Sequence, residues 1–326
     1  GIRDVAVTGV QTCALPIFLA LRILHELSVP THSAFFLMAL FLTNPYVIRY
    51  YLIAPTMLAD LLFVTGLGFA ILGLVRGKPS ALFTGALIAT LGRQSMILAL
   101  PGIWIWLAFG SAWRPKKLQT RAGMALLLSV LVIATYHLLG AIALRFSSVP
   151  SFQSSLFFSV FPWLLGPDFQ SRIFGEHLLR CLLPELPLFS AAMVAAWIGR
   201  SKVWSADLSG ALLIALGIIA QPLLVNPLFM EQNQSRQSAI AMLPLMVAAG
   251  AVFRTLQLET HSFLGGGLLA IGTILTSTHH LYTIWGPSNV MAYTAQVLTG
   301  CIFLALGIAL QARKKSAGTF NGKKAP

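Results

Sequence analysis

The segment from Ala81 to Phe109 limits what this chain can fold into more than any other stretch. It is almost continuously apolar and carries a single charged residue, Arg93, near its middle. An ionisable group at membrane depth costs roughly 2.5–3.5 kcal/mol on insertion scales unless it faces protein or water. The segment is therefore either one long membrane span with a buried arginine, or two short helices that turn at residues 91–95.

The composition shows that the whole chain has this character. Hydrophobic residues make up 57% of the 326 residues and charged residues only 10%, whereas a soluble domain carries about 25% charged residues. The net charge of +13 comes mostly from basic residues in short loops between apolar runs, which is the positive-inside pattern of membrane proteins. We therefore expect an all-α, polytopic transmembrane helix bundle in the cell or inner membrane, in contact with lipids and not with nucleic acid.

Sequence motifs for metals or cofactors are not evident. The chain has no glycine-rich phosphate loop, no CxxC pair and no HExxH. Cys181 and Cys301 lie in or beside apolar segments far apart in the sequence, which favours packing residues over a disulfide or metal site. His279 and His280 could bind a metal or carry protons, but adjacent helical side chains point in different directions. We predict no metal site and no cofactor.

Residues 1–17 are not expected to belong to the native protein. The segment GIRDVAVTGVQTCALPI has neither the basic start nor the long apolar stretch of a signal peptide. Over its whole length it resembles the translation of a short-read sequencing adapter. We therefore expect native sequence from about Phe18, in a reading frame that has lost its N-terminal part. Residues 18–27 would be the last turns of a truncated helix.

Apolar runs of suitable length recur through the rest of the chain. A helix needs roughly 20 apolar residues to cross the hydrocarbon core. We expect about 10 membrane helices within a bundle over residues 18–311, followed by a basic cytoplasmic tail at 312–326. The predicted helices are 33–46, 52–75, two within 81–109, 122–144, 186–199, 208–225, 238–253, 263–283 and 291–310.

Basic loops alternate along the chain. The strongest of them, 110–121, is placed in the cytoplasm by the positive-inside rule. Counting the predicted spans from this loop puts the loops 200–207 and 254–262 and the C-terminal tail on the same side. The long region 145–185 then lies on the outer side, where its prolines predict short helices on the membrane surface or against the bundle.

The small basic loop that contains Arg76 and Lys78 decides how the segment 81–109 is arranged. The loop joins the cytoplasmic set only if the segment 81–109 crosses twice, and a single crossing would place it outside. We therefore predict a short helical hairpin, with Pro101 in its second half, and two helices that pair inside the bundle. Arg93 is then directed toward the outer side.

Polar residues expected on the outer side form the candidate site for a substrate. They are Arg49, Tyr50, Arg93, Gln94, Glu231 and Arg236. Because the forked donors of guanidinium suit phosphate, a phospholipid or a polyprenyl phosphate is the natural partner. Arg49 and Arg236 could instead anchor the protein at lipid head groups. Asp60, nine residues into a predicted span, should face the interior, where it either pairs with an arginine or faces a hydrated cavity.

Two stretches resemble the GT-C superfamily of polyprenol-phosphate-sugar-dependent glycosyltransferases. TNPYVIRYYLIAPTMLAD followed by a span, and then ATLGRQSMILALPGIWIWLAF, is similar to the family's outer segment, short helix and arginine-containing turn. The run from Arg236 to Pro244 resembles an arginine-led span after a polar outer loop. Thr56 follows Pro55 where the family often has an acidic residue, and Asp60 lies one helical turn further on.

The resemblance implies transfer of a sugar from a polyprenyl-phosphate carrier to an acceptor on the outer face. Arginines such as Arg93 and Arg236 would hold the donor phosphate and stabilise its leaving charge. The family's catalytic aspartate usually lies in a first outer loop, which would precede Phe18, so we expect this fragment to be inactive alone. A transporter or flippase, or a polysaccharide polymerase, that handles an anionic lipid-linked substrate is the alternative. Matching broken helices in inverted repeats would favour a transporter, and the sequence shows one broken hairpin without a clear mate.

Overall fold

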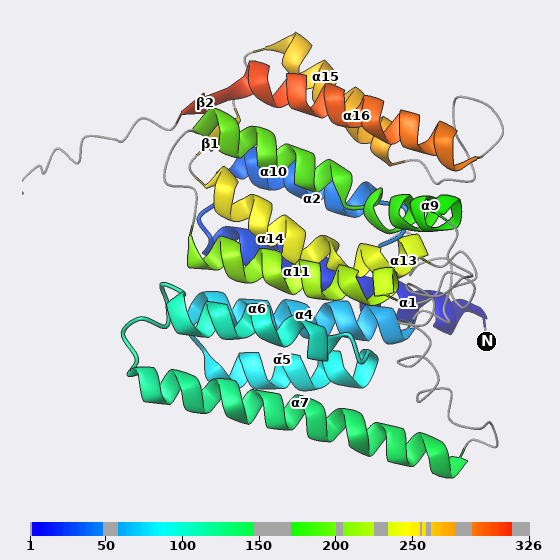
Figure 1. Cartoon of the computed structure of the whole chain (residues 1–326). Coiled ribbons are helices and arrows are strands. Elements are labelled where there is room, and N and C mark those ends of the chain that lie inside the picture. Colours follow the sequence, from blue (N-terminus) through cyan, green and yellow to red (C-terminus); the bar gives the residue numbers. More distant parts are fainter. Residues whose placement is uncertain are drawn as a thin grey trace, which may run out of the picture.

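The protein is a bundle of helices that run in nearly parallel and antiparallel directions. The computed structural model describes residues 2–47, 58–146, 171–199, 205–224, 234–254, 256–258, 262–277 and 289–314. Figure 1 shows the helices stacked side by side, with α7 at one edge of the bundle and α15 and α16 at the other. The expectation of a helix bundle is confirmed.

The helices account for nearly all of the described chain. They are α1 (Ile2–Glu26), α2 (Thr31–Thr43), α4 (Leu58–Arg76), α5 (Pro79–Gly92), α6 (Met96–Phe109), α7 (Leu118–Phe146), α9 (Ser171–Leu182), α10 (Leu186–Gly199), α11 (Ala206–Leu224), α13 (Gln234–Ser238), the 3-10 helix η2 (Ala239–Ala241), α14 (Met242–Phe253), α15 (Phe263–Thr276) and α16 (Val290–Gln311). Whether residues 1–17 are native stays a prediction, since a helical backbone does not report the origin of a sequence.

Fewer helices than expected are long enough to cross a membrane on their own. Within the described residues, 5 helices meet the criteria of length and apolar character, or up to 6 if the bent pair α9–α10 is one span. The helices α2, α5, α6 and α15 have only 13 or 14 residues, which is about 21 Å at most against a hydrocarbon core of about 30 Å. The structure therefore supports an integral membrane protein, but not about 10 spans.

The segment 81–109 forms the predicted hairpin. Helix α5 ends at Gly92, α6 begins at Met96, and the basic loops before and after the hairpin meet at one end of the bundle (Figure 1). Trp113 Nε1 donates a hydrogen bond to Leu74 O at 2.8 Å, and Lys116 Nζ donates to Gly77 O at 2.8 Å. These bonds join the two loops, as expected from the positive charges that placed both loops on the same side of the membrane.

The expected pairing of the two hairpin helices with each other is wrong. Helix α5 packs chiefly against α4, and α6 chiefly against α11. The reason is steric, because glycines let the backbones of α4 and α5 approach closely. A methyl group on Gly66 would lie 2.7 Å from Gly85 O, and one on Gly85 would lie 2.6 Å from Gly66 O. Glycine contacts of the same kind join α6 to α11 through Gly102 and Gly210.

The C-terminal tail begins as a strand rather than as a free extension. Strand β2 (Ala312–Lys314) pairs antiparallel with β1 (Leu256–Leu258), with Gln257 opposite Arg313. Arg254, just before β1, forms an ion pair of 4.0 Å with Asp207 at the start of α11. The start of the tail therefore lies at the same end of the bundle as Arg254, which borders the loop 254–262, and Asp207, which borders the loop 200–207. This grouping agrees with the prediction. Which side of the cell this end faces stays a prediction.

Helices α9 and α10 form a bent pair that the sequence divided differently. The sequence predicts that residues 171–182 belong to an outer loop region and that residues 186–199 form a short span, but the two helices meet at an angle of 68° across a short break. His177 and Cys181 on α9 are buried, so α9 lies against the bundle. Cys181 and Cys301 are both buried and free, which confirms that they pack in the interior.

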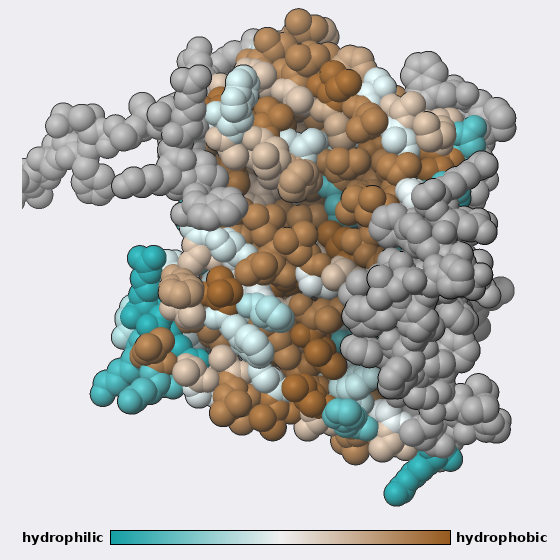
Figure 2. Space-filling model, in the orientation of Figure 1, coloured by the Kyte–Doolittle hydropathy of each residue, from teal (hydrophilic) through white to brown (hydrophobic). Residues whose placement is uncertain are grey.

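The outer surface of the bundle is consistent with lipid as its surroundings. On the face drawn in Figure 2, apolar residues dominate the middle, and hydrophilic side chains gather at the end where α6 connects to α7. Helix α7 is the most exposed candidate span, with only 17% of its most apolar window buried inside the protein. An apolar helix that leaves most of its surface uncovered is stable when the solvent is hydrocarbon.

The glycine contact between α4 and α5 predicts a large effect from a small change. We expect Gly85→Val to destabilise the bundle by about 1–3 kcal/mol, because the new side chain would meet the backbone of α4. Gly123→Val on α7 is the matched control, since a Cβ atom added there has no atom of another element within 4 Å. Thermal unfolding of both variants in detergent checks this, and equal unfolding midpoints would contradict it.

The carboxylate at the end of α1 predicts a dependence on pH. Glu26 accepts ion pairs from Arg76 at 2.6 Å and from Arg22 at 2.9 Å. The hydrogen bond from Arg76, helped by both positive charges, lowers the pKa of Glu26. The pairs should therefore stabilise the fold above the pKa that Glu26 has in the unfolded chain, and this contribution should be lost as the pH falls through the lowered pKa.

We expect Glu26→Gln to lower the free energy of unfolding by up to about 1 kcal/mol at neutral pH, since the pair is partly exposed. In acid the difference from the wild type should vanish. Unfolding in detergent across the pH range measures it, and a constant difference would argue against the ion pairs.

Candidate functional site

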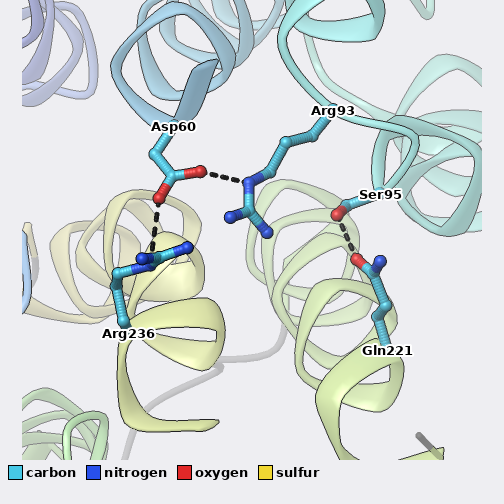
Figure 3. A network of polar contacts seen from close by, with 5 residues as sticks. All are labelled: Asp60, Arg93, Ser95, Gln221 and Arg236. Carbon is cyan, nitrogen blue, oxygen red and sulfur yellow. Dashed lines mark hydrogen bonds and ion pairs between the residues drawn. The ribbon is translucent and has the colours of Figure 1, made fainter. Parts of the chain in front are cut away.

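Asp60 lies at the centre of a polar network inside the bundle. It is in the first turn of α4 and only 2% exposed. Arg93 Nε donates a hydrogen bond to Asp60 Oδ1, and Arg236 Nε lies 3.4 Å from Asp60 Oδ2. Figure 3 shows the carboxylate between the two guanidinium groups. The sequence left open whether Asp60 pairs with an arginine or faces a hydrated cavity. In the structure it pairs with two arginines.

Local structure places each of these side chains. Arg93 directly follows α5 in an extended conformation, with φ −154° and ψ 145°, where the chain turns toward α6. A Cβ atom added at Gly92 would lie 2.6 Å from Ala59 O. The end of α5 therefore packs against the first turn of α4, which contains Asp60. Arg236 comes from α13, which is held to α9 by a hydrogen bond of 2.7 Å from Ser235 Oγ to Arg180 O.

Among the described residues, two guanidinium groups face one carboxylate, and these three side chains together carry one positive charge. The side chains of Arg93 and Arg236 are 16% and 17% exposed, so both are largely withdrawn from water. The terminal nitrogens of Arg93 have no hydrogen-bond partner among the described residues, and Figure 3 shows them directed toward the space between Arg236 and Gln221. Chemically, the arrangement is suited to hold an anion.

A second polar pair lies beside this network. Ser95 Oγ donates a hydrogen bond to Gln221 Oε1, and Ser95 is 2% exposed (Figure 3). Sequence reasoning missed both residues. A signal was present for Gln221, because it is the only amide or charged side chain in α11 after Asp207, and a lone polar group in an apolar helix needs a partner inside the protein. Ser95 carried no such signal.

The structure brings together only some of the predicted site residues. Arg93, Arg236 and Asp60 meet in one network. Gln94 is exposed and is not part of the network. The remaining predicted site residues and the predicted histidine pair lie outside the described residues: Arg49, Tyr50, Glu231, His279 and His280.

The described residues do not form a metal site. In that part of the chain, no group of three or more His, Cys, Asp or Glu side chains is placed to hold a metal ion. In the central network the single carboxylate faces two cations, which would repel a metal ion. The polar groups of the site therefore suit an anion better than a cation.

Comparisons of the chain with protein-family models, with curated proteins and with solved structures find no match. The resemblance to the GT-C superfamily thus stays a prediction from the sequence stretches quoted above.

Asp60 should be essential for the stability of this network. We expect Asp60→Asn to lower the free energy of unfolding by roughly 3–5 kcal/mol, because it leaves two largely buried cations without their carboxylate. Added inorganic phosphate should restore part of the lost stability by binding the unpaired guanidinium groups.

The matched control is Asp207→Asn, the same chemical change at the looser ion pair of 4.0 Å with Arg254, whose own side chain is 37% exposed. It should cost less than about 1 kcal/mol and respond little to phosphate. Thermal unfolding in detergent with phosphate or chloride measures both variants. If the two lost equal stability, Asp60 would not hold the arginines together.

Proposed function

We propose that this protein is an integral membrane glycosyltransferase in which Arg93 and Arg236 bind the phosphate of a polyprenyl-phosphate-linked sugar. The observation that carries the proposal is the convergence of the two arginines on Asp60. Three segments far apart in the sequence contribute to the network, and its excess positive charge is largely withdrawn from water. Holding charged groups inside an apolar bundle costs free energy, and groups held at this cost are typically functional.

The charge of the network supports a phosphodiester as the ligand. The linkage between a sugar and a polyprenyl phosphate is a diester with one negative charge, which balances the one excess positive charge of the two arginines and Asp60. Guanidinium groups bind phosphate through two parallel N–H donors. The terminal nitrogens of Arg93 supply such a pair, since Asp60 contacts only its Nε.

The proposed reaction breaks the bond between the sugar carbon and the phosphate oxygen. The bonding electrons remain on the phosphate, which becomes a monoester with more negative charge, and the acceptor oxygen forms the new bond to the sugar. The arginines would stabilise the charge that develops on the leaving phosphate. The acceptor proton goes to a general base. Asp60 is a positioning residue, because both of its oxygens face arginine Nε atoms.

A carrier or flippase for an anionic lipid-linked substrate is the second candidate, and one observation favours it. Transporters often contain broken helices at matching positions. The hairpin α5–α6 had no clear mate in the sequence, whereas the bent pair α9–α10 is a second interruption of an apolar stretch. Reconstitution into vesicles separates the two candidates, because a carrier moves its lipid without changing it.

The two arginines should contribute directly to ligand affinity. We expect Arg93→Ala and Arg236→Ala each to weaken binding of a short-chain polyprenyl phosphate glucose by about 10- to 100-fold, since a hydrogen bond to a charged group is worth about 1.5–3 kcal/mol. Native mass spectrometry of the full chain in detergent measures the affinity. Arg93→Lys should retain part of it, because lysine keeps the charge and loses the fork.

Arg254→Ala is the matched control, because it removes an arginine from an ion pair with Asp207. It should leave the affinity unchanged. Equal binding by the wild type and both site variants, with all of them folded, would refute the phosphate-binding role. Binding without sugar transfer, but with movement of the lipid across a vesicle membrane, would support the carrier.

A further inference from the structure

Glu185 is a buried carboxyl group at the break between α9 and α10. It is 4% exposed, and neither of its side-chain oxygens reaches the surface. The residue directly precedes α10, and its backbone oxygen accepts a hydrogen bond of 3.0 Å from Phe189 N. Asn44 Nδ2 donates to Pro184 O at 3.0 Å, which ties the break to the end of α2.

The carboxyl group lacks a compensating partner among the described residues. Neither side-chain oxygen has a hydrogen bond there, and none of the ion pairs between described residues includes Glu185. Ser238 lies beside the carboxyl group. However, Ser238 has a single hydroxyl hydrogen, which it donates to Ser235 O at 3.2 Å. A single neutral hydroxyl therefore does not balance a negative charge on Glu185.

Within the described side chains, the helices packed around Glu185 supply no cation to it either. Among the side chains that the structure describes, their titratable or charged residues are His32 on α2, Tyr46 after it, Glu176, His177, Arg180 and Cys181 on α9, Arg236 on α13, and Tyr293 and Cys301 on α16, while α10 and α14 have none. Of these, Cys181 and Tyr293 lie near enough to act on the carboxyl group, and both are ordinarily neutral at neutral pH. Arg236 pairs with Asp60 instead.

An ionised carboxylate in such surroundings is costly unless a positive charge accompanies it. Carboxyl, hydroxyl and phenol oxygens are also the kind of ligand that a small hard cation prefers. Breaks in membrane helices are places where protons and alkali cations bind in transporters, because the interrupted backbone exposes polar groups. Ser238, Tyr293 and the break itself surround Glu185 with groups of this kind.

We propose that Glu185, at the α9–α10 break, is a binding site for a single small monovalent cation, a proton or an alkali ion, which neutralises its carboxylate and exchanges with solution. The site is distinct from the arginine network and does not depend on the proposed function. Helix α13 borders both sites, since Arg236 faces Asp60 and Ser238, two residues further on, faces Glu185.

Labelling with a hydrophobic carbodiimide tests the proposal, because this reagent modifies protonated carboxyl groups in apolar surroundings. The full chain in detergent is labelled at a series of pH values in choline chloride or in sodium chloride, and the Glu185 peptide is quantified by mass spectrometry. We expect labelling at low pH that falls about tenfold for each pH unit above its midpoint, as for a single titrating group.

The two salts identify the cation. Equal labelling in choline and sodium at every pH would show that the site takes a proton alone, whereas lower labelling in sodium would show that sodium competes for it. Glu26 is the control in the same sample, because it is paired with Arg22 and Arg76 and should label little. The label must disappear in Glu185→Gln.

An infrared titration of the carboxylic acid C=O band, compared between the wild type and Glu185→Gln, reports the same proton without a reagent. Labelling that does not change with pH or sodium, together with an infrared band that does not titrate, would overturn the proposal. So would the absence of both signals. The labelling is measured on the wild type, so it does not require the variant to fold.

Discussion

The ion pairs of Asp60 with Arg93 and Arg236 hold three remote segments in one place. They join the first turn of α4, the turn between α5 and α6, and the short helix α13. In an apolar bundle each of these charges is costly alone, so the segments that carry them are stable only together. Arg93 lies in the turn between α5 and α6, so its ion pair with Asp60 fixes this turn beside α4. Helix α6 continues from the same turn and packs on α11.

Glycine contacts provide the frame in which these charges meet. Because Gly66 and Gly85 have no side chain, α4 and α5 pack closely along their length. This approach carries the end of α5 to the start of α4, where Arg93 reaches Asp60. The excess positive charge that results is the basis for proposing a phosphate ligand. Glu185, near Ser238 at the end of α13, is a contrasting case, a potential negative charge without a partner in the described chain.

Several features of the fold could be predicted because they follow from local composition. Arg76 and Lys78 before the segment 81–109, and a basic loop after it, predicted a hairpin, and the contacts of Trp113 and Lys116 confirm that the two loops meet. The grouping of Arg93 with Arg236 followed from the same alternation of sides. The pairing of Ser95 with Gln221 did not, because two neutral residues 126 positions apart leave no pattern in the sequence.

By itself, the sequence determined that this chain forms apolar helices, where most of them begin and end, and which ends carry positive charge. These properties depend on hydropathy, on glycine and proline, and on the preference of charge for water, all of which act locally. Only the tertiary structure decided that α5 packs on α4 rather than on α6, that Asp60 is shared by two arginines, and that Glu185 is buried. These outcomes depend on which backbones can approach each other and on the cost of separating charges, and both are set by contacts between remote residues.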